Sequence, residues 1–265
     1  MAYSDKDIVL ITGGNGGIGL EVARQLTRDH GKRFHVLVGC RSLSDGEAAV
    51  KRLQEEDGVG EGVEAIQIDI TSEESLAAAA KQVGDKFGRL DVLHANAGIS
   101  GDQTYAGRPI GEVITLTVAT NAAGAAASVE HFVPLLSRAK NPRVVFMSSG
   151  AGSLKLAHDF AFVKDYPAYS VSKAAENMVM LYYHHRFPGW KVNASNPGFR
   201  ATKINNYGQG SKETPGPVSE GAMNAVRLTL LGEDGESGTH TMIQASQDEY
   251  SKTMEGKNNI VTVPW

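Results

Sequence analysis

Two side chains that could transfer a proton, Tyr169 and Lys173, stand four residues apart in the second half of the chain. On a helix, residues with this spacing share one face, so both functional ends can point into one site. A free phenol has a pKa of about 10 and is a reluctant acid at neutral pH, but a neighbouring ammonium group favours its ionised form. The pair therefore suggests general acid-base chemistry. Pairs with this spacing are common on helix surfaces, so other segments must support this interpretation.

A glycine-rich segment follows the apolar run Ile8–Ile11 and opens directly into a helical run. It reads Thr12-Gly13-Gly14-Asn15-Gly16-Gly17-Ile18-Gly19. Glycines let the backbone approach a pyrophosphate, and the N-terminus of the following helix offers free N–H groups and the positive end of its dipole. Strand, turn and helix stand in the order that this binding mode requires. We therefore predict a dinucleotide site rather than a flexible turn without a ligand.

The spacing of these glycines, Gly13-x₃-Gly17-x-Gly19, differs from the general dinucleotide fingerprint and resembles the turn of the short-chain dehydrogenase/reductase family. Further segments match the family in the same order, and they are Asn96-Ala97-Gly98, Asn121, Ser148-Ser149, Tyr169-x₃-Lys173 and Pro197-Gly198-x₃-Thr202. Together they extend over about three quarters of the chain. By this resemblance the chain is identified as a member of the family.

The resemblance implies a role for each residue. Tyr169 would protonate a carbonyl oxygen, Ser149 would position that carbonyl, and Lys173 would support Tyr169 and hold the nicotinamide ribose. Asn121 would anchor a water that connects Lys173 to a proton relay, and the family pattern favours Ser149 over the adjacent Ser148. The residues implied in cofactor binding are Gly13, Asn15, Gly17, Ile18, Gly19, Asp69, Ile70, Asn96, Ala97, Gly98, Tyr169, Lys173, Pro197, Gly198 and Thr202.

The end of the second predicted strand bears on which nicotinamide is used. In dinucleotide folds an acidic residue there selects NAD, whereas an arginine nearby accommodates the 2′-phosphate of NADP. The first charged residue here is Arg41, whose guanidinium matches a phosphate bidentately, and we predict NADP(H). An ordinary surface arginine is the alternative. Asp69 matches the family's adenine-contacting aspartate, although it could equally cap the helix that begins near Ser72.

The chain departs from the family pattern between Ser149 and Tyr169, which are twenty residues apart, several more than usual. We expect the excess to form a loop over Leu154–Pro167. Two segments, about residues 150–168 and 199–218, should line the substrate pocket, because loops after the carboxyl ends of parallel strands form the ligand crevice. Their apolar residues favour an apolar ketone or, alternatively, only pack the loops onto the body; they are Leu154, Leu156, Phe160, Phe162, Phe199, Ile204 and Tyr207.

Short apolar runs alternate with helical stretches along the chain, which predicts an α/β fold: a single domain with a doubly wound parallel sheet, the Rossmann fold. The expected strands are Ile8–Ile11, Phe34–Val38, Val63–Ile68, Val92–Ala95, Val144–Met147 and Val192–Ser195. The expected helices are Ile18–His30, Ser44–Glu56, Ser72–Phe87, Glu112–Ser137, Ala168–Phe187 and Ser219–Leu231. The C-terminal tail, about residues 244–265, differs from the family and could cover the pocket, pack on the body or contact a second subunit.

Composition restricts the kinds of partner, compartment and metal site that we expect for this protein. The formal net charge of −4, without a Lys/Arg cluster, argues against a nucleic-acid partner. The single cysteine, Cys40, and a start without a basic segment before an apolar one indicate a reducing, cytoplasmic setting. No uninterrupted apolar run reaches the length of a membrane span. The histidines lack carboxylate or cysteine partners at ligand spacing, so we expect no metal site.

These observations favour an NADPH-dependent reductase of a carbonyl on a small organic molecule, acting in small-molecule or secondary metabolism. The same residues could oxidise an alcohol or reduce an imine or iminium group. A cofactor-binding sensor without turnover is the alternative from another class, although a sensor need not keep Ser149, Tyr169 and Lys173 together. The resemblance also implies a homodimer or homotetramer built on the helices that carry Asn121 and Tyr169.

Overall fold

A largely parallel sheet forms the centre of the computed structural model, which describes residues 5–56, 58–59, 62–160, 162–209, 214–244, 256–257 and 259–265. Within these residues the sheet has nine strands in the order β3-β2-β1-β4-β5-β6-β7-β9-β8. The strands are β1 (Asp7–Thr12), β2 (Phe34–Cys40), β3 (Val63–Gln67), β4 (Val92–Ala95), β5 (Arg143–Met147), β6 (Lys191–Ser195), β7 (His240–Ile243), β8 (Gly256–Lys257) and β9 (Ile260–Thr262).

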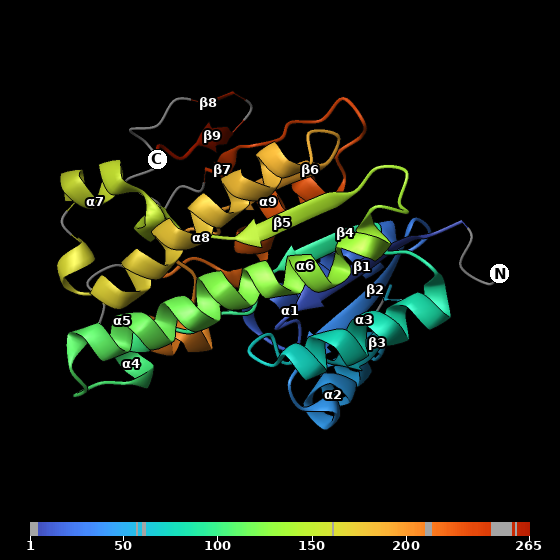
Figure 1. Cartoon of the computed structure of the whole chain (residues 1–265), viewed down its shortest axis with the longest axis horizontal. Helices are drawn as coiled ribbons and strands as arrows, with labels where there is room; N and C mark the ends of the chain where they lie inside the picture. Colours follow the sequence, from blue (N-terminus) through green and yellow to red (C-terminus); the bar gives the residue numbers. More distant parts are fainter. Residues whose placement is uncertain are drawn as a thin grey trace.

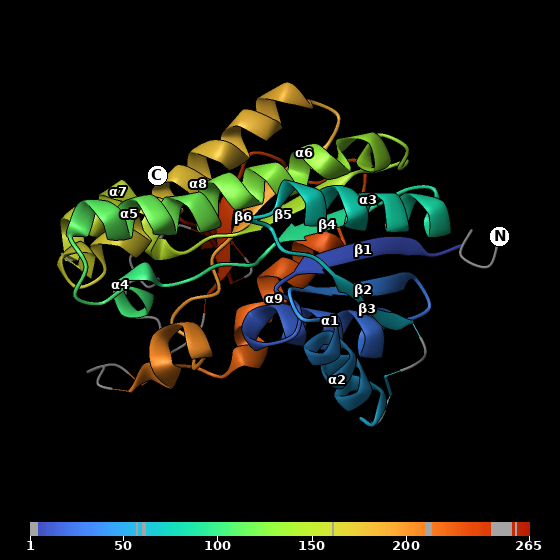
Figure 2. The same cartoon turned by 60° about the horizontal axis from the view of Figure 1, so that its bottom comes forward.

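Helices cover both faces of this sheet (Figures 1 and 2). One layer contains α3 (Glu73–Phe87), α5 (Ile110–Val118), α6 (Ala125–Leu136) and α8 (Pro167–Arg186), and the other contains α1 (Gly17–His30), α2 (Leu43–Gln54) and α9 (Val218–Thr229). In β1, Ile8 and Leu10 belong to the first hydrophobic core, whereas Val9 and Ile11 belong to the second. Every apolar residue of such a strand is therefore buried, and the doubly wound α/β fold in a single domain is confirmed.

The helix expected over Glu112–Ser137 has a more complex form. A short helix, α4 (Gly101–Thr104), precedes it, and a π-helical turn, Ala119–Gly124, separates α5 from α6. By length and composition the 27-residue stretch Ile110–Leu136 could cross a membrane, since an 18-residue window within it has a mean hydropathy of 1.2. The core helix of a globular domain passes the same test, and here the stretch packs against α8, α3 and β4.

The expectation of a loop over Leu154–Pro167 is wrong. Leu154–Phe160 form the helix α7, and Phe162–Lys164 form a 3-10 turn. The Ser153 hydroxyl accepts a hydrogen bond from the Leu156 backbone N–H at 3.1 Å, and Lys155 pairs with Asp159 one turn later. Leu156 is buried with the apolar residues Met242, Val261 and Val263. These local bonds and the apolar anchor stabilise a helix where composition alone suggested a loop.

The described part of the C-terminal tail extends the sheet. Strand β9 pairs antiparallel with both β7 and β8. The Val263 N–H donates to the His240 carbonyl at 2.8 Å, and the Lys155 N–H donates to the Trp265 carbonyl at 3.2 Å. The tail therefore packs on the body of the domain, next to α7. Residues 245–255 and 258 of this tail lie outside the described residues.

The segment after β6, expected to be a loop over about residues 199–218, also contains regular structure. Lys203–Gly208 form 3-10 turns, interrupted by a kink at Asn206 and Tyr207, whose φ angles are 49° and 56°. Residues 210–213 lie outside the described residues, and Arg200 forms an isolated parallel bridge with Gly216. The turn thus returns to the body just before α9.

Candidate active site

The glycine turn is tied to the end of β4 by a network of hydrogen bonds. The Thr12 hydroxyl donates to the His94 carbonyl and accepts from the backbone N–H groups of Asn96 and Ala97, at 3.0 and 3.1 Å. The Asn96 amide donates to the Thr12 carbonyl at 2.8 Å. Gly13 has a φ of +64°, and a Cβ added there would lie 2.9 Å from the Ala97 Cα. Only glycine fits this close approach of two backbones.

Residues after β6 reach the same turn. Gly17 has a φ of +54°, and a Cβ added to it would lie 3.6 Å from the Thr202 methyl group. Gly198 also has a positive φ, +73°, and its N–H donates to the Asn196 side chain at 3.0 Å. The structure therefore brings the Pro197-Gly198 segment and Thr202 against the start of α1, where Asn15 and Ile18 are half-buried. The predicted cofactor residues of these segments form one continuous edge.

Arg41 and Asp69 lie on adjacent strand ends, at the far side of this edge. Arg41 directly follows β2 and is exposed. The Asp69 carboxylate accepts from the backbone N–H and the hydroxyl of Thr71, at 2.9 and 2.7 Å. Burial raises the pKa of Asp69, but these two bonds and the charge of Arg41 outweigh it and lower the pKa. Ser72 caps α3 instead of Asp69, since its hydroxyl accepts from the Ser75 N–H. Ile70 is buried.

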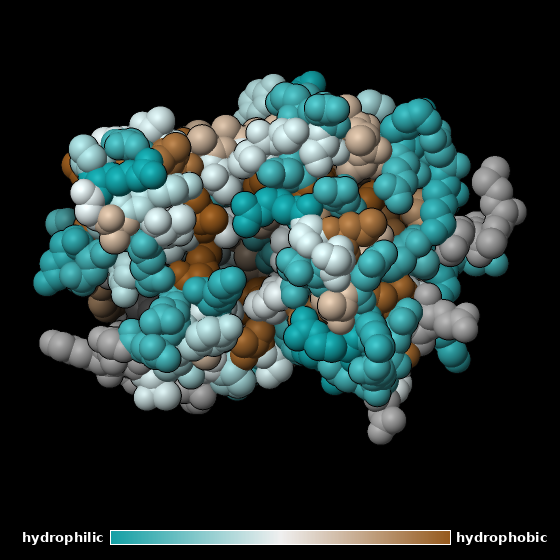
Figure 3. Space-filling model, turned by 90° about the horizontal axis from the view of Figure 1, so that it is seen from below, coloured by the Kyte–Doolittle hydropathy of each residue, from teal (hydrophilic) through white to brown (hydrophobic). Residues whose placement is uncertain are grey.

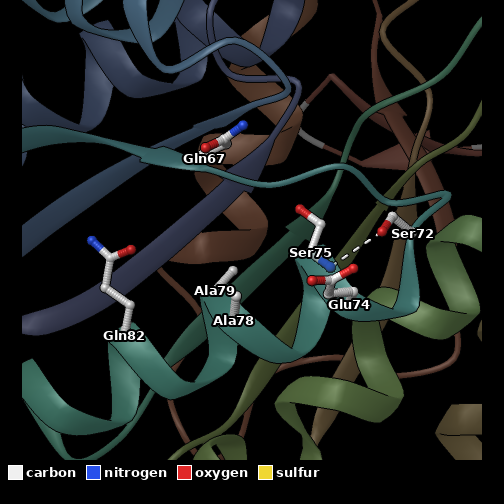
Figure 4. A pocket seen from close by; sticks show the side chains of 7 residues that line it. All are labelled: Gln67, Ser72, Glu74, Ser75, Ala78, Ala79 and Gln82. Carbon is white, nitrogen blue, oxygen red and sulfur yellow. Dashed lines mark hydrogen bonds between the residues drawn. The ribbon is translucent and has the colours of Figure 1, made fainter.

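A shallow pocket of about 330 Å³ adjoins the Asp69 turn (Figure 4). The Ser75 hydroxyl on its wall accepts from the Asp69 N–H at 2.9 Å, and the Ser75 N–H donates to Ser72. Its lining residues come from β3 and α3 and are Gln67, Ser72, Glu74, Ser75, Ala78, Ala79 and Gln82. Tyr169, Lys173 and Ser149 do not line it. The pocket is therefore separate from the predicted reaction centre.

Tyr169 and Lys173 lie on the first two turns of α8, which has Pro167 at its first position. The Lys173 ammonium nitrogen is 5.7 Å from the centre of the Tyr169 ring and donates to the Met147 carbonyl at 2.7 Å. Tyr169 is half-buried, whereas Lys173 is 3% exposed. Burial lowers the pKa of Lys173, but the neighbouring Glu176 and Tyr169 outweigh it and raise the pKa. The ammonium group therefore stays charged beside the phenol.

The two serines after β5 have different surroundings. The Ser148 hydroxyl is buried and donates to the Asn177 side chain at 2.6 Å. The Ser149 hydroxyl is half-buried and accepts from the Ala151 N–H at 3.1 Å. A Cβ added to Gly152 would lie 2.7 Å from the Lys173 carbonyl carbon, so the segment after Ser149 lies directly against α8. Despite the long interval in sequence, Ser149 thus lies at the strand end that Lys173 contacts.

Asn121 lies in the π-helical turn and is fully buried. Its side-chain oxygen accepts from the Ile99 N–H at 2.8 Å, and its amide donates to the Ile99 carbonyl and the Ser172 hydroxyl. A Cβ on Gly98 would lie 3.2 Å from the Asn121 oxygen and 3.7 Å from the Lys173 ammonium nitrogen. Asn121, Lys173 and the segment after β4 therefore meet at one point.

Two acidic residues at this site were absent from the sequence-based prediction. Asp102, on α4, accepts from the backbone N–H groups of Ala168 and Tyr169, at 3.0 and 2.8 Å. Glu176 is 1% exposed and accepts from the Lys173 ammonium group at 2.6 Å. A signal for Glu176 was available, because a residue three positions after Lys173 shares its helix face. Nothing local in the sequence connects Asp102 with a helix more than sixty residues later.

The residues predicted to line the substrate pocket differ in their exposure to solvent. Leu154, Phe160 and Tyr207 are exposed, and Phe199 and Ile204 are half-buried. Leu156 instead packs against the C-terminal strand, so its alternative role in packing is the one observed. The side chain of Phe162 lies outside the described part of the structure. Viewed from below, the molecule is hollowed near its centre, and hydrophobic side chains gather in the hollow between hydrophilic flanks (Figure 3).

Comparisons with known proteins agree with this arrangement. A family model described as short chain dehydrogenase matches residues 7–212. Short-chain dehydrogenase/reductase ATR10 of Stachybotrys chlorohalonatus is 50% identical over 271 residues, which cover 99% of this chain and 95% of that protein. The structure of salutaridine reductase from Papaver somniferum has a TM-score of 0.74 at 25% identity and covers 89% of this chain and 99% of its own.

A Pseudomonas aeruginosa RhlG/NADP complex is similar to the same degree, with a TM-score of 0.74 at 25% identity. The match covers 88% of this chain and 93% of that one. The family model alone spans well over half of the chain, and the relative with 50% identity spans nearly all of it. The chain therefore belongs to the short-chain dehydrogenase/reductase family of oxidoreductases.

Proposed function

We propose that this protein is an NADPH-dependent reductase of a carbonyl group on a small, apolar organic molecule. One observation carries the proposal: a buried, charged Lys173 lies under the half-buried ring of Tyr169, at the strand end that also holds Ser149. This arrangement supports Tyr169 as the proton donor, because the ammonium stabilises the oxyanion left after donation. The Ser149 hydroxyl is the group available to position the carbonyl oxygen.

The residues along the edge formed by the glycine turn, the end of β4 and the segment after β6 fit a dinucleotide. Gly16 and Gly17, at the start of α1, are exposed and carry no side chain, so their backbone is accessible to a pyrophosphate. We assign cofactor binding to this turn, Asn96-Ala97-Gly98, Asp69, Ile70, Lys173, Pro197-Gly198 and Thr202. When bound, the nicotinamide supplies the hydride. The exposed Arg41 is the group we assign to the 2′-phosphate, and the NADP named for RhlG supports this assignment.

The chemical class of the substrate follows from the segments around the site. Leu154 and Tyr207 are strongly exposed, with relative residue accessibilities of 74% and 59%. Exposed apolar side chains on segments that follow the strand ends favour an apolar ligand. Salutaridine reductase, a relative, is named as a reductase, which supports the reductive direction. We therefore place this chain among reductases of small-molecule or secondary metabolism.

Consumption of NADPH, and separately of NADH, against aromatic, polycyclic and aliphatic ketones and cyclic imines tests the proposal. We expect turnover with NADPH and a ketone, and its loss in Tyr169→Phe with NADPH binding retained, because this change removes one hydroxyl and little volume. Full turnover in Tyr169→Phe would overturn the assignment of the acid. Turnover of imines alone would replace the carbonyl with an imine, and NADPH binding without any turnover would favour the sensor.

We also propose a homodimer or homotetramer built on α8. Val171, Met178 and Tyr182 stand seven and then four residues apart and are 42%, 67% and 54% exposed, so they form an apolar stripe on one face of the helix. On the helix that carries Asn121, the small residues Ala122 and Ala125 are buried within the domain, so they are not part of this stripe. Sedimentation of the wild type and of Met178→Lys tests the stripe: we expect the variant to be monomeric.

The cytoplasmic setting and the absence of a nucleic-acid partner stay predictions.

A further inference from the structure

A buried carboxylate, Glu176, contacts the lysine that supports the predicted proton donor. The Glu176 carboxylate accepts from the Lys173 ammonium group at 2.6 Å, and the exposed fractions of the two side chains are 1% and 4%. The second carboxylate oxygen, Oε1, is buried and has no hydrogen-bond partner among the described residues. A buried carboxylate normally has both oxygens satisfied, so this one is an unusual choice for a purely structural ion pair.

Lys173 is the ionisable group that contacts Glu176, and the ring of Tyr169 lies near the ammonium group of Lys173. Elements packed against α8 also carry charged residues: Asp102 on α4 bonds to the helix N-terminus, Glu112 on α5 and Lys164 are exposed, and Arg143 and Lys191 begin their strands, at the opposite end from Met147. The pKa of Glu176 responds only to burial and to Lys173. The charge state of the pair therefore depends on burial, on the two residues themselves and on Tyr169, which acts on Lys173.

The charge of Glu176 changes what Lys173 offers to its neighbours. When Glu176 is ionised, its negative charge at hydrogen-bond distance offsets the positive charge of the ammonium. When Glu176 is protonated, Lys173 presents its full positive charge to the Tyr169 oxygen. Burial raises the pKa of Glu176 to about 7, although Lys173 opposes the shift. The raised pKa brings protonation of Glu176 toward neutral pH, and because the two groups are coupled, the change in charge is a property of the pair.

We propose that Glu176 is a positioning residue that sets the net charge which Lys173 presents to Tyr169, and so controls how readily Tyr169 donates its proton. The inference deepens the proposed reductase function and rests on it. With Glu176 protonated, the oxyanion left on Tyr169 is stabilised by an unopposed ammonium group and reduction is fast. With Glu176 ionised, the pair is neutral and reduction is slower.

The first test needs no substrate. Infrared spectra of the full chain, with isotope-labelled glutamate, are measured at pH values on either side of neutrality. We expect the band of a protonated, buried carboxyl group at low pH, its loss as the pH rises through about 7, and its absence in Glu176→Gln. If the wild type lacks this band at every pH, Glu176 does not titrate and the inference is overturned, whatever the outcome of the ketone assay.

The second test uses the pH profile of kcat for the reduced substrate. For the wild type we expect kcat to fall roughly threefold to tenfold as the pH rises through about 7. This is the size expected when one neighbouring group, Glu176, becomes negatively charged and offsets the charge of Lys173. Glu176→Gln keeps the shape and hydrogen bonding of the side chain without its charge, and its kcat should stay high across this range. Asp91→Asn, which neutralises a buried carboxylate paired with Arg89 at the other end of β4, should keep the wild-type profile.

A purely structural Glu176 would lower kcat in Glu176→Gln at all pH values without changing the shape of the profile, and that result would contradict the inference. If no compound in the panel is reduced, the proposed function fails, while the infrared titration still decides the protonation of Glu176. If Glu176→Gln does not fold, the infrared titration of the labelled wild-type protein decides by itself whether Glu176 titrates.

Discussion

The Asp102 carboxylate accepts from the backbone N–H of Tyr169 at 2.8 Å and, through its other oxygen, from that of Ala168 at 3.0 Å. Two of the free N–H groups at the start of α8 thus bond to a side chain from α4, in the place of a local cap. A carboxylate is favourable there because it faces the positive end of the helix dipole. This hydrogen bond therefore fixes the backbone nitrogen of Tyr169, the residue that is predicted to donate the proton from its side chain.

We expect Asp102→Ala to lower both stability and turnover. Loss of a helix cap costs about 1 kcal/mol, within a range of about 0.5 to 2 kcal/mol, and urea unfolding measures this loss. The frayed first turn also carries Tyr169, so kcat should fall more than KM rises. Tyr183→Phe is a matched control, since it removes hydrogen bonds to Ala126 and Glu130 at the far end of α8. If Asp102→Ala loses stability but keeps full kcat, the cap is structural only.

The glycine turn allows a paired test within four residues. Gly13→Ala places a methyl group 2.9 Å from the Ala97 Cα in a backbone with a φ of +64°, so we expect a loss of about 1 kcal/mol or more in stability and weaker NADPH binding. Gly16→Ala meets no protein atom within 4 Å and has an extended backbone, with a φ of −164°, so the stability of this variant should stay unchanged. Thermal unfolding and NADPH fluorescence titration measure the difference. Equal effects of the two changes would argue against the close approach.

Arg41→Asp tests the choice of nicotinamide. Hydrogen bonds between charged groups contribute about 1.5 to 3 kcal/mol, so we expect NADPH affinity to fall roughly tenfold to a hundredfold while NADH affinity changes little. Arg52→Asp makes the same charge change at an exposed position of α2 and should leave the ratio of the two affinities unaltered. Calorimetric titration of both cofactors gives the ratio. An equal loss for NADPH and NADH would remove Arg41 from the 2′-phosphate site.

Two fully buried histidines predict acid sensitivity. Burial lowers the pKa of His240 to about 3, and burial together with the Arg143 charge lowers the pKa of His94 to about 3. In the unfolded chain a histidine has a pKa of about 6.5, so the contribution to stability is complete above this pH and is lost as the pH falls toward 3. Each residue should add roughly 1.4 kcal/mol per pH unit to the decline in the free energy of unfolding.

Chemical unfolding between pH 7 and pH 4 checks this expectation. His240→Leu removes two buried ring nitrogens that have no hydrogen-bond partner among the described residues, so its free energy of unfolding should decline less steeply with acid than that of the wild type. His185→Leu, at an exposed position, should keep the wild-type slope. A slope unchanged by His240→Leu would mean that the ring is protonated in the folded state.

Local patterns predicted the regular parts of the fold well. The strand expected over Ile8–Ile11 is Asp7–Thr12 in the structure, and the helix expected over Ala168–Phe187 is Pro167–Arg186. Both follow from properties of neighbouring residues, namely an uninterrupted apolar run and a helical repeat. The helix α7 was missed, because Leu156 is held there by Val261 and Val263, about a hundred residues later. The family resemblance also favoured a loop at this point.

The sequence by itself determined the order of the cofactor segments and the shared helix face of Tyr169 and Lys173, because a glycine turn and a four-residue spacing are local properties of the chain. Only the tertiary structure decided that Asp102 bonds to Tyr169, that Glu176 is buried beside Lys173, and that the tail ends on α7. These contacts depend on which elements become neighbours in space and on how much water they exclude, and a linear pattern carries no signal for either.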